Sequence, residues 1–375
     1  MKNIMICLTA FSFIMADVHI SGDARVRPRY DIIEYGDGSS TSDLYYLYRG
    51  RINVKADIGD GWFFKTQLGT NSVAGMTKMG ALNEEESYTF NPSVSFMELY
   101  FGYKNEKCGF WAEAFPLKYN PGLDLHFYAD KLVDIPFVLF SNGSIGGFAG
   151  YHSVLNHKLN WFLSVDSNVT NQTIDDNDEA IDLKDSYTLG FNTDIPMGPL
   201  SFSPRFMMSM GEDNNVLPTT FGADINLPKV AGFSSMTSYY ISSYGNPGTD
   251  AWLSYQDSTD TFLSDEMNDY QVDHLRFLIS RPVGSGKLKL FYDIASKKYN
   301  YIVKGEEDGE LYDNSTIDVI TDKLSFLWLS YTHTCYKGKM GDVTVSPTFR
   351  LQNGAIGNDA YSRAKFEITT QINFK

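Results

Sequence analysis

The chain has 375 residues, with 31 Lys and Arg against 46 Asp and Glu, so its formal net charge at pH 7 is −15. Because a nucleic acid carries a dense negative charge, this balance argues against nucleic acid as a partner. Three cysteines are too few for a disulfide framework in a chain of this length, so the fold must rest on hydrogen bonding and packing.

Residues 1–16 have the layout of a secretory signal peptide. A single lysine, Lys2, precedes an apolar run, and the small residue Ala16 ends it. We therefore expect export without a lipid anchor, cleavage near Ala16 and a mature chain of residues 17–375. After residue 16 no apolar run is long enough for a membrane-spanning helix. Barrel strands, in contrast, are only about ten residues long and half polar.

The first three segments of the mature chain alternate between apolar and polar residues. Side chains of a β-strand point to opposite faces in turn, so each segment has one apolar face and one polar face. The polar faces of the segments 18–32, 43–57 and 61–71 carry Lys55 and six further cations: Arg25, Arg27, Arg29, Arg49, Arg51 and Lys65.

About sixteen segments have strand character. After the first three they are 93–104, 107–116, 145–153, 157–168, 183–194, 199–210, 217–227, 231–243, 269–281, 286–298, 321–334, 340–352 and 361–374. The faces of 231–243 and 321–334 cannot be assigned, and Pro28, Pro204 and Pro347 fall inside strands, where a proline removes a ladder bond.

Connections between these segments alternate in length. The odd-numbered ones are mostly long and polar: 33–42, 72–92, 117–144, 169–182, 211–216, 244–268, 299–320 and 353–360. The even-numbered ones are tight and rich in Gly, Pro, Asn and Asp, as suits a β-hairpin. Long loops at one rim and short periplasmic turns at the other predict an all-β fold, a transmembrane antiparallel up-and-down β-barrel. The 15% of aromatic residues fits girdles at two membrane interfaces.

Two segments resemble the general porin family of Gram-negative outer membranes. They are R-G-R-I-N-V-K-A-D-I-G-D-G-W-F-F-K-T-Q-L-G (49–69) and E-A-F-P-L-K-Y-N-P-G-L-D-L-H (113–126). The chain also resembles the phosphate-selective porins, more weakly. The resemblance implies an outer-membrane channel for passive diffusion of small hydrophilic solutes and ions. It also implies a homotrimer embedded among outer-membrane lipids and lipopolysaccharide.

In that family the third loop folds into the lumen, so the resemblance makes 117–144 the constriction loop. Its charged or titratable residues are Asp124, His126, Asp130, Lys131 and Asp134. The basic wall that would face it consists of the six cations above. Barrel closure would add three more from the last two strands, namely Arg350, Arg363 and Lys365. Glu98 and Glu113 would be further acids of the lumen. Opposed charges across a narrow aqueous neck would sort solutes by charge.

Two interpretations of this wall stay open: it guides anions, or its charges are balanced by acids of a wet lumen. The alternative function is a plugged outer-membrane barrel that acts as a surface receptor, adhesin or barrel enzyme. A soluble exported β-sandwich is the third alternative. No G-x-S-x-G elbow, EF-hand loop or zinc spacing occurs in the sequence, so we expect no enzyme, no metal site and no cofactor.

Overall fold

The structure is a computed structural model, and it describes most of the chain. The residues described are 18–70, 76–79, 93–116, 144–155, 157–168, 173–174, 180–181, 185–210, 219–244, 267–307, 310–356 and 359–375. The expected signal peptide and the expected constriction-loop residues Asp124, His126, Asp130, Lys131 and Asp134 lie outside these ranges. None of the described residues forms a helix of the length and apolarity needed to cross a membrane.

Sixteen principal strands make up the described part of the fold. They are β1 (Val18–Tyr35), β2 (Ser40–Gly59), β3 (Trp62–Gly69), β5 (Ser95–Lys104), β6 (Cys108–Pro116), β7 (Ser144–Val154), β8 (His157–Ser167), β11 (Ser186–Thr193), β13 (Leu200–Met210), β14 (Thr219–Val230), β15 (Phe233–Tyr244), β16 (Met267–Val283), β17 (Gly286–Glu307), β18 (Glu310–Lys337), β19 (Gly341–Ile356) and β20 (Asp359–Phe374). Four short strands accompany them: β4 (Thr77–Lys78), β9 (Thr173–Ile174), β10 (Ala180–Ile181) and β12 (Ile195–Met197).

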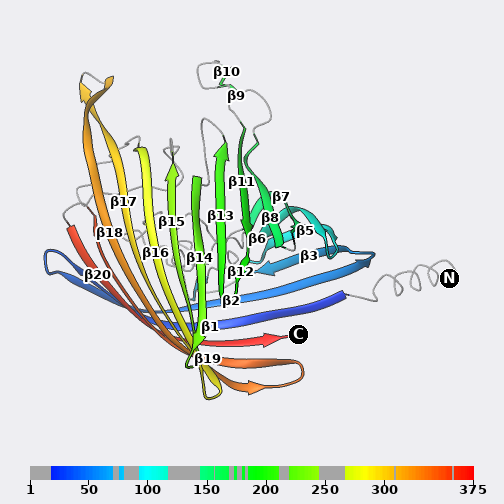
Figure 1. Cartoon of the computed structure of the whole chain (residues 1–375). Helices are drawn as coiled ribbons and strands as arrows, with labels where there is room; N and C mark the ends of the chain where they lie inside the picture. The colour runs from blue at the N-terminus through cyan, green and yellow to red at the C-terminus, as the bar shows by residue number, and fades with distance from the viewer. Residues whose placement is uncertain are drawn as a thin grey trace, which may run out of the picture.

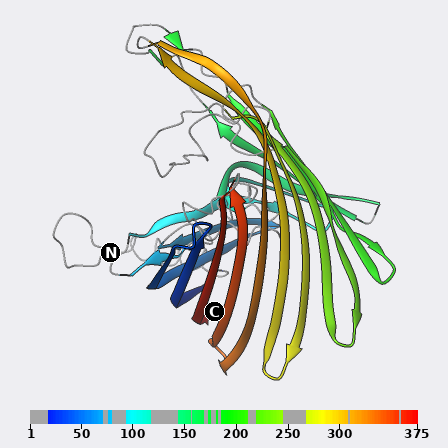
Figure 2. The same cartoon turned by 90° about the vertical axis from the view of Figure 1, so that its left-hand side faces the viewer.

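The principal strands form a closed antiparallel barrel. Each pairs with its neighbours in chain order, and β1 pairs with β20 in the register Arg29↔Glu367. Figures 1 and 2 show the last strand (red) beside the first (blue). Closure leaves no open edge, so the backbone hydrogen bonds of every principal strand can be made within the sheet. The prediction of an all-β up-and-down barrel is confirmed, and each of the sixteen predicted segments overlaps one strand.

Three connections predicted as long loops instead contain continuing strand. The β17–β18 ladder extends to Glu307↔Glu310, β19–β20 to Ile356↔Asp359 and β1–β2 to Glu34↔Ser40. The predicted loops at 299–320, 353–360 and 33–42 were therefore wrong in extent. Alternation of apolar residues marks only the apolar band of a barrel, whereas backbone pairing can continue beyond it.

Pro28 lies at a local gap in the β1–β20 ladder. The register runs through Val26↔Thr370 and resumes at Arg29↔Glu367, with no paired positions between them. A proline has no N–H to donate to a neighbouring strand, which accounts for the gap. The barrel tolerates it because β1 keeps its pairing with β2 through the same positions.

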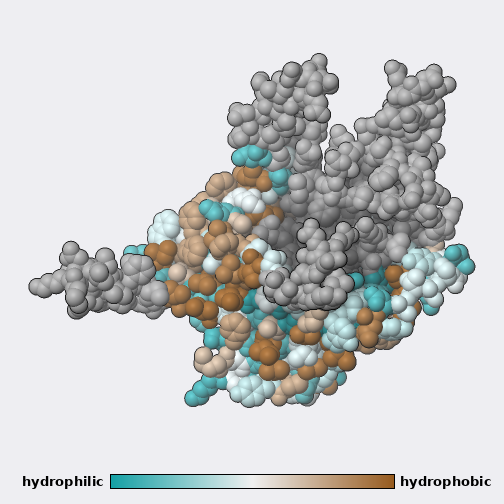
Figure 3. Space-filling view, turned by 180° about the vertical axis from the view of Figure 1, so that it is seen from behind, coloured by the Kyte–Doolittle hydropathy of each residue, from teal (hydrophilic) through white to brown (hydrophobic). Residues whose placement is uncertain are grey.

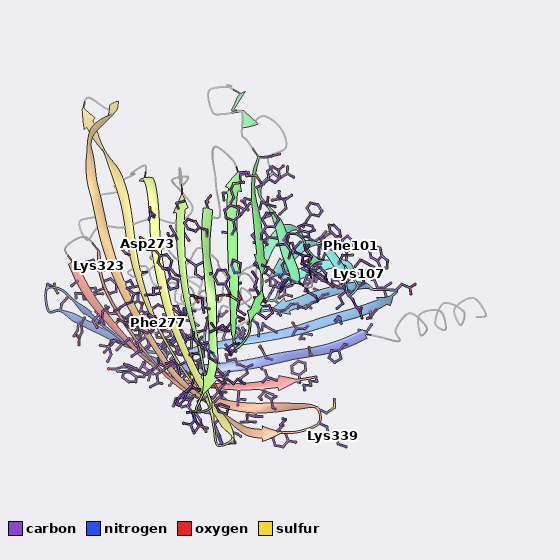
Figure 4. All side chains as sticks on the ribbon, viewed as in Figure 1. Phe101, Lys107, Asp273, Phe277, Lys323 and Lys339 are labelled. Atoms are coloured by element: carbon purple, nitrogen blue, oxygen red, sulfur yellow. The ribbon has the colours of Figure 1, made fainter. Side chains whose placement is uncertain are left out.

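The two faces of the barrel invert the usual distribution of polarity. On β1, the even-numbered residues Ile20 and Tyr30 are 54% and 42% exposed. Arg29, whose side chain points to the opposite face, is 5% exposed. Figure 3 shows apolar residues (brown) across the described outer surface, and Figure 4 marks Phe277 midway along β16. A soluble protein seldom exposes so large an apolar surface. The arrangement is typical of a barrel whose outer face meets lipid and whose inner face meets water.

Replacing Phe277 by arginine tests the environment of the outer face. Phe277 is 45% exposed, and a cation near the bilayer midplane costs about 2–4 kcal/mol. We expect Phe277→Arg to lower the free energy of unfolding from lipid vesicles by that amount, measured by urea titration. Leu155→Arg is the matched control, because Leu155 lies in the short β7–β8 turn and should change stability by about 1 kcal/mol or less. Equal effects at the two sites would contradict a lipid-facing Phe277.

Candidate functional site

The inner face of β1, β2, β19 and β20 brings together eight of the nine predicted basic residues. Strand pairing places Arg25 opposite Arg49, and Lys365 opposite both Asp31 and Arg350. We call these eight cations the basic wall: Arg25, Arg27, Arg29, Arg49, Arg51, Arg350, Arg363 and Lys365. Local alternation aims them all at one face, and the β1–β20 pairing joins the two ends of the chain.

Glu367 is the centre of this wall. Its carboxylate accepts hydrogen bonds from Arg29 Nε at 2.9 Å and from an Arg29 terminal nitrogen at 2.7 Å. Arg27 Nη1 lies 3.3 Å from the same carboxylate, and Arg350 forms an ion pair with it. The Glu367 side chain is 0% exposed. One buried carboxylate on β20 therefore holds three guanidinium groups from two strands, β1 and β19.

Two aspartates organise the remaining arginines. Asp31 accepts from Arg363 Nε at 2.8 Å and from the Tyr45 hydroxyl at 3.1 Å. Asp23 accepts from Arg51 Nε at 2.9 Å and from Arg49 at 3.2 Å. These charge-assisted bonds fix the side chains in one arrangement, since an arginine fork and a carboxylate match in geometry.

Neutral partners also contact the arginines of the wall. Arg25 Nε donates to the Gln371 side chain at 2.9 Å, and Arg27 Nε donates to the Thr369 hydroxyl at 2.8 Å. Arg350 lies over the Trp328 ring, with its guanidinium carbon 3.7 Å from the ring centroid. Eight cations share three acids (Asp23, Asp31 and Glu367), so the formal charge of the group is +5. The acids position the arginines without neutralising them.

Lys65 and Glu98 lie apart from the basic wall. Lys65 Nζ is 2.7 Å from the Glu98 carboxylate, which makes a separate ion pair between β3 and β5. Glu113 is exposed and lies opposite Tyr100 and Gly147 in the ladder. Among the described residues Glu113 forms no ion pair.

Two further charged clusters lie on the inner face of β13–β17, and none of their residues is among the site residues predicted from the sequence. Arg276 pairs with Asp293, and His274 Nε2 lies 3.1 Å from the same aspartate. Arg205 lies 2.8 Å from Asp224, which also accepts the Tyr240 hydroxyl at 2.9 Å. Alternation along β16 and β17 would have placed His274, Arg276 and Asp293 on the polar face, but their contact depends on the strand register. Within the described ranges no group of three or more His, Cys, Asp or Glu could hold a metal ion.

The chain has no match among protein-family models or curated proteins. Solved structures do match it. The in-vitro folded OmpT of Vibrio cholerae, an outer membrane protein in a trimer form, matches with a TM-score of 0.52 and 9% identity, covering 96% of this chain and 100% of that one. An anion-selective porin from Comamonas acidovorans matches with a TM-score of 0.53 and 12% identity over 95% and 100% of the two chains.

A third solved structure is Salmonella typhi OmpF in complex with daunomycin. It matches with a TM-score of 0.53 and 12% identity, over 94% of this chain and 97% of that chain. At such low identity the three likenesses bear on the fold alone. Together with the closed barrel of sixteen strands, they show that the chain has a porin-like fold.

Proposed function

We propose that the chain forms a water-filled channel in a bacterial outer membrane, through which small hydrophilic solutes and ions diffuse passively. The observation that carries this proposal is the inversion of the barrel's two faces, with apolar side chains exposed outside and charged side chains gathered inside. A closed sheet with this polarity suits a bilayer outside and water within.

The basic wall would give this channel its electrostatic character. A formal charge of +5 on one side of the lumen attracts anions, and a low-dielectric wall concentrates the field in the aqueous space. We propose that residues 117–144 narrow the lumen opposite the wall, with Asp124, Asp130 and Asp134 supplying the opposite charge. The balance between the wall and these acids would set the ion preference.

The remaining features of the proposal concern assembly and location. We infer export, cleavage of the signal peptide near Ala16, and contact of the outer face with outer-membrane lipids and lipopolysaccharide. A homotrimer is part of the proposal, supported by the trimer form of a protein that shares this fold. The channel has no catalytic role in this proposal.

Conductance across a planar bilayer tests the proposed function directly. The purified, folded chain should produce discrete conductance steps that rise with salt concentration. A folded barrel that inserts and never conducts would overturn the channel and favour a plugged barrel, which acts through its outer surface.

Neutralising part of the basic wall should shift the ion preference toward cations. A triple variant that combines Arg25→Gln, Arg27→Gln and Arg49→Gln lowers the formal charge of the basic wall and its three acids from +5 to +2. A unit charge about 8 Å from an ion in water is worth about 0.5 kcal/mol, or about twofold in permeability per charge. Reversal potentials in a salt gradient measure this shift. Arg281→Gln is the control, because Arg281 is exposed on the rim outside the wall.

Removing the central carboxylate should have the opposite effect. Glu367→Gln leaves the three guanidinium groups of Arg27, Arg29 and Arg350 without their shared acid and raises the formal charge of the wall by one. We expect about twofold higher anion preference in the same measurement. Glu98→Gln is a matched control elsewhere on the inner face, since it removes an acid that pairs with a single cation. A shift toward cations in Glu367→Gln would contradict an aqueous path along the wall.

Shortening the third long connection should widen the channel. Deletion of residues 124–134 removes the three acids and should raise the single-channel conductance while lowering cation preference. Deletion of residues 252–262 in another long connection is the control of equal length. An unchanged conductance after the first deletion would show that this segment does not narrow the lumen.

A further inference from the structure

The short-turn ends of β14–β20 carry an uneven distribution of charge. Three hairpin turns and the end of the last strand lie in sequence around this part of the rim, and the turns appear together at the bottom of Figure 2. Residues 226–233, 281–287, 335–342 and 373–375 contain six basic side chains and one acidic side chain, that of Asp342. We call the six cations the basic arc: Lys229, Arg281, Lys287, Lys337, Lys339 and Lys375.

The six cations are exposed and available to an outside partner. All of them are exposed, and among the described residues none of them takes part in an ion pair. Asp342 accepts a hydrogen bond from the Asn373 amide at 2.6 Å. Arg281 lies over the Phe233 ring, 4.8 Å from its centroid, and so joins two neighbouring hairpins. The arc therefore presents uncompensated positive charge along a continuous edge.

Large apolar side chains lie among these cations, three of them at the ends of strands and one in a turn. Val230 is 67% exposed beside Lys229, and Met340 is 73% exposed beside Lys339. Tyr336, next to Lys337, and Val283, two residues from Arg281, are exposed as well. Apolar side chains that insert below a layer of phosphates, with cations at the level of that layer, are characteristic of a membrane interface.

We propose that the basic arc binds the phosphate headgroups of anionic glycerophospholipids in the leaflet at the short-turn rim. Charge complementarity supplies the attraction, and the exposed apolar side chains favour a lipid over a soluble polyanion, which would gain nothing from them. The inference rests on the membrane location proposed above but not on an open channel.

The same rim contains an internal control. On the β2–β8 side, residues 57–62, 103–108 and 154–158 contain three cations and three acids. The cations are Lys104, Lys107 and Lys158, and the acids are Asp57, Asp60 and Glu106. Figure 4 marks Lys107 at this side of the rim and Lys339 at the turn between β18 and β19. Charge on this second side is balanced, so it should not select anionic lipid.

Lipid binding to the full-length folded barrel in detergent tests the proposal. Native mass spectrometry would count bound phosphatidylglycerol and phosphatidylcholine of the same acyl composition. Wild-type protein should retain more phosphatidylglycerol than phosphatidylcholine. The variant Lys229→Glu, Lys337→Glu and Lys339→Glu should weaken that retention at least tenfold, since each basic residue near an anionic surface contributes roughly fivefold. We call this triple variant the arc variant. The control variant, Lys104→Glu, Lys107→Glu and Lys158→Glu combined, should change phosphatidylglycerol retention by less than the arc variant does.

The outcomes separate this proposal from the channel function. Equal retention of the two lipids by wild-type protein would overturn the proposal, as would equal losses in the two variants. Soluble polyphosphate that binds the arc as tightly as phosphatidylglycerol would overturn the choice of a lipid. Planar-bilayer conductance of the arc variant supplies the second readout, because normal conductance with lost lipid retention places the defect at the rim and not in the lumen. Heat-dependent electrophoretic mobility confirms that both variants are folded.

Discussion

The pairing of the first strand with the last is the constraint on which the rest of this structure depends. Without the β1–β20 ladder the sheet would have two open edges, each with unpaired backbone N–H and C=O groups that a hydrocarbon environment does not tolerate. The same pairing assembles the basic wall. Arg29 reaches Glu367, Arg25 reaches Gln371 and Arg363 reaches Asp31, each across this seam. Barrel closure and site formation are therefore one structural event.

Acids inside the wall keep the cations in place while leaving a positive excess. Burying arginine costs free energy unless hydrogen bonds and opposite charges compensate it, and Glu367, Asp31 and Asp23 provide that compensation from the middle and the two ends of the wall. Aromatic rings add to it, since Arg350 lies over Trp328 and Arg276 over Phe291. Within the described residues the inner face thus carries several charged clusters, of which the basic wall is the largest, and aromatic rings contact some of their arginines.

Much of the fold and most of the basic wall could be predicted from the sequence, because one local signal determines both. Alternation with a period of two identifies a strand and assigns its faces, and barrel closure then predicts that cations from both ends of the chain share a wall. The strand pairing brings eight of these cations together on one face. The faces of 321–334 stayed unassigned for identifiable reasons. Phe326 and Trp328 are aromatic residues on the inner face, and the register of β18 shifts between Thr334 and Tyr336, so the period breaks. The Arg276–Asp293 and Arg205–Asp224 pairs depend on register between strands, which alternation along a single strand does not specify.

The seam also determines the order in which the barrel can be completed. Arg29 and Glu367 are separated by 338 positions, so their contact closes a loop that spans almost the whole chain. Contacts between such distant residues form late, because the chain between them must first be ordered. The arginines of β1 are therefore synthesised long before Glu367, their partner on β20. Until β20 pairs with β1, water must solvate these arginines. The pairing of β1 with β20 thus completes the ladder and the charged wall together.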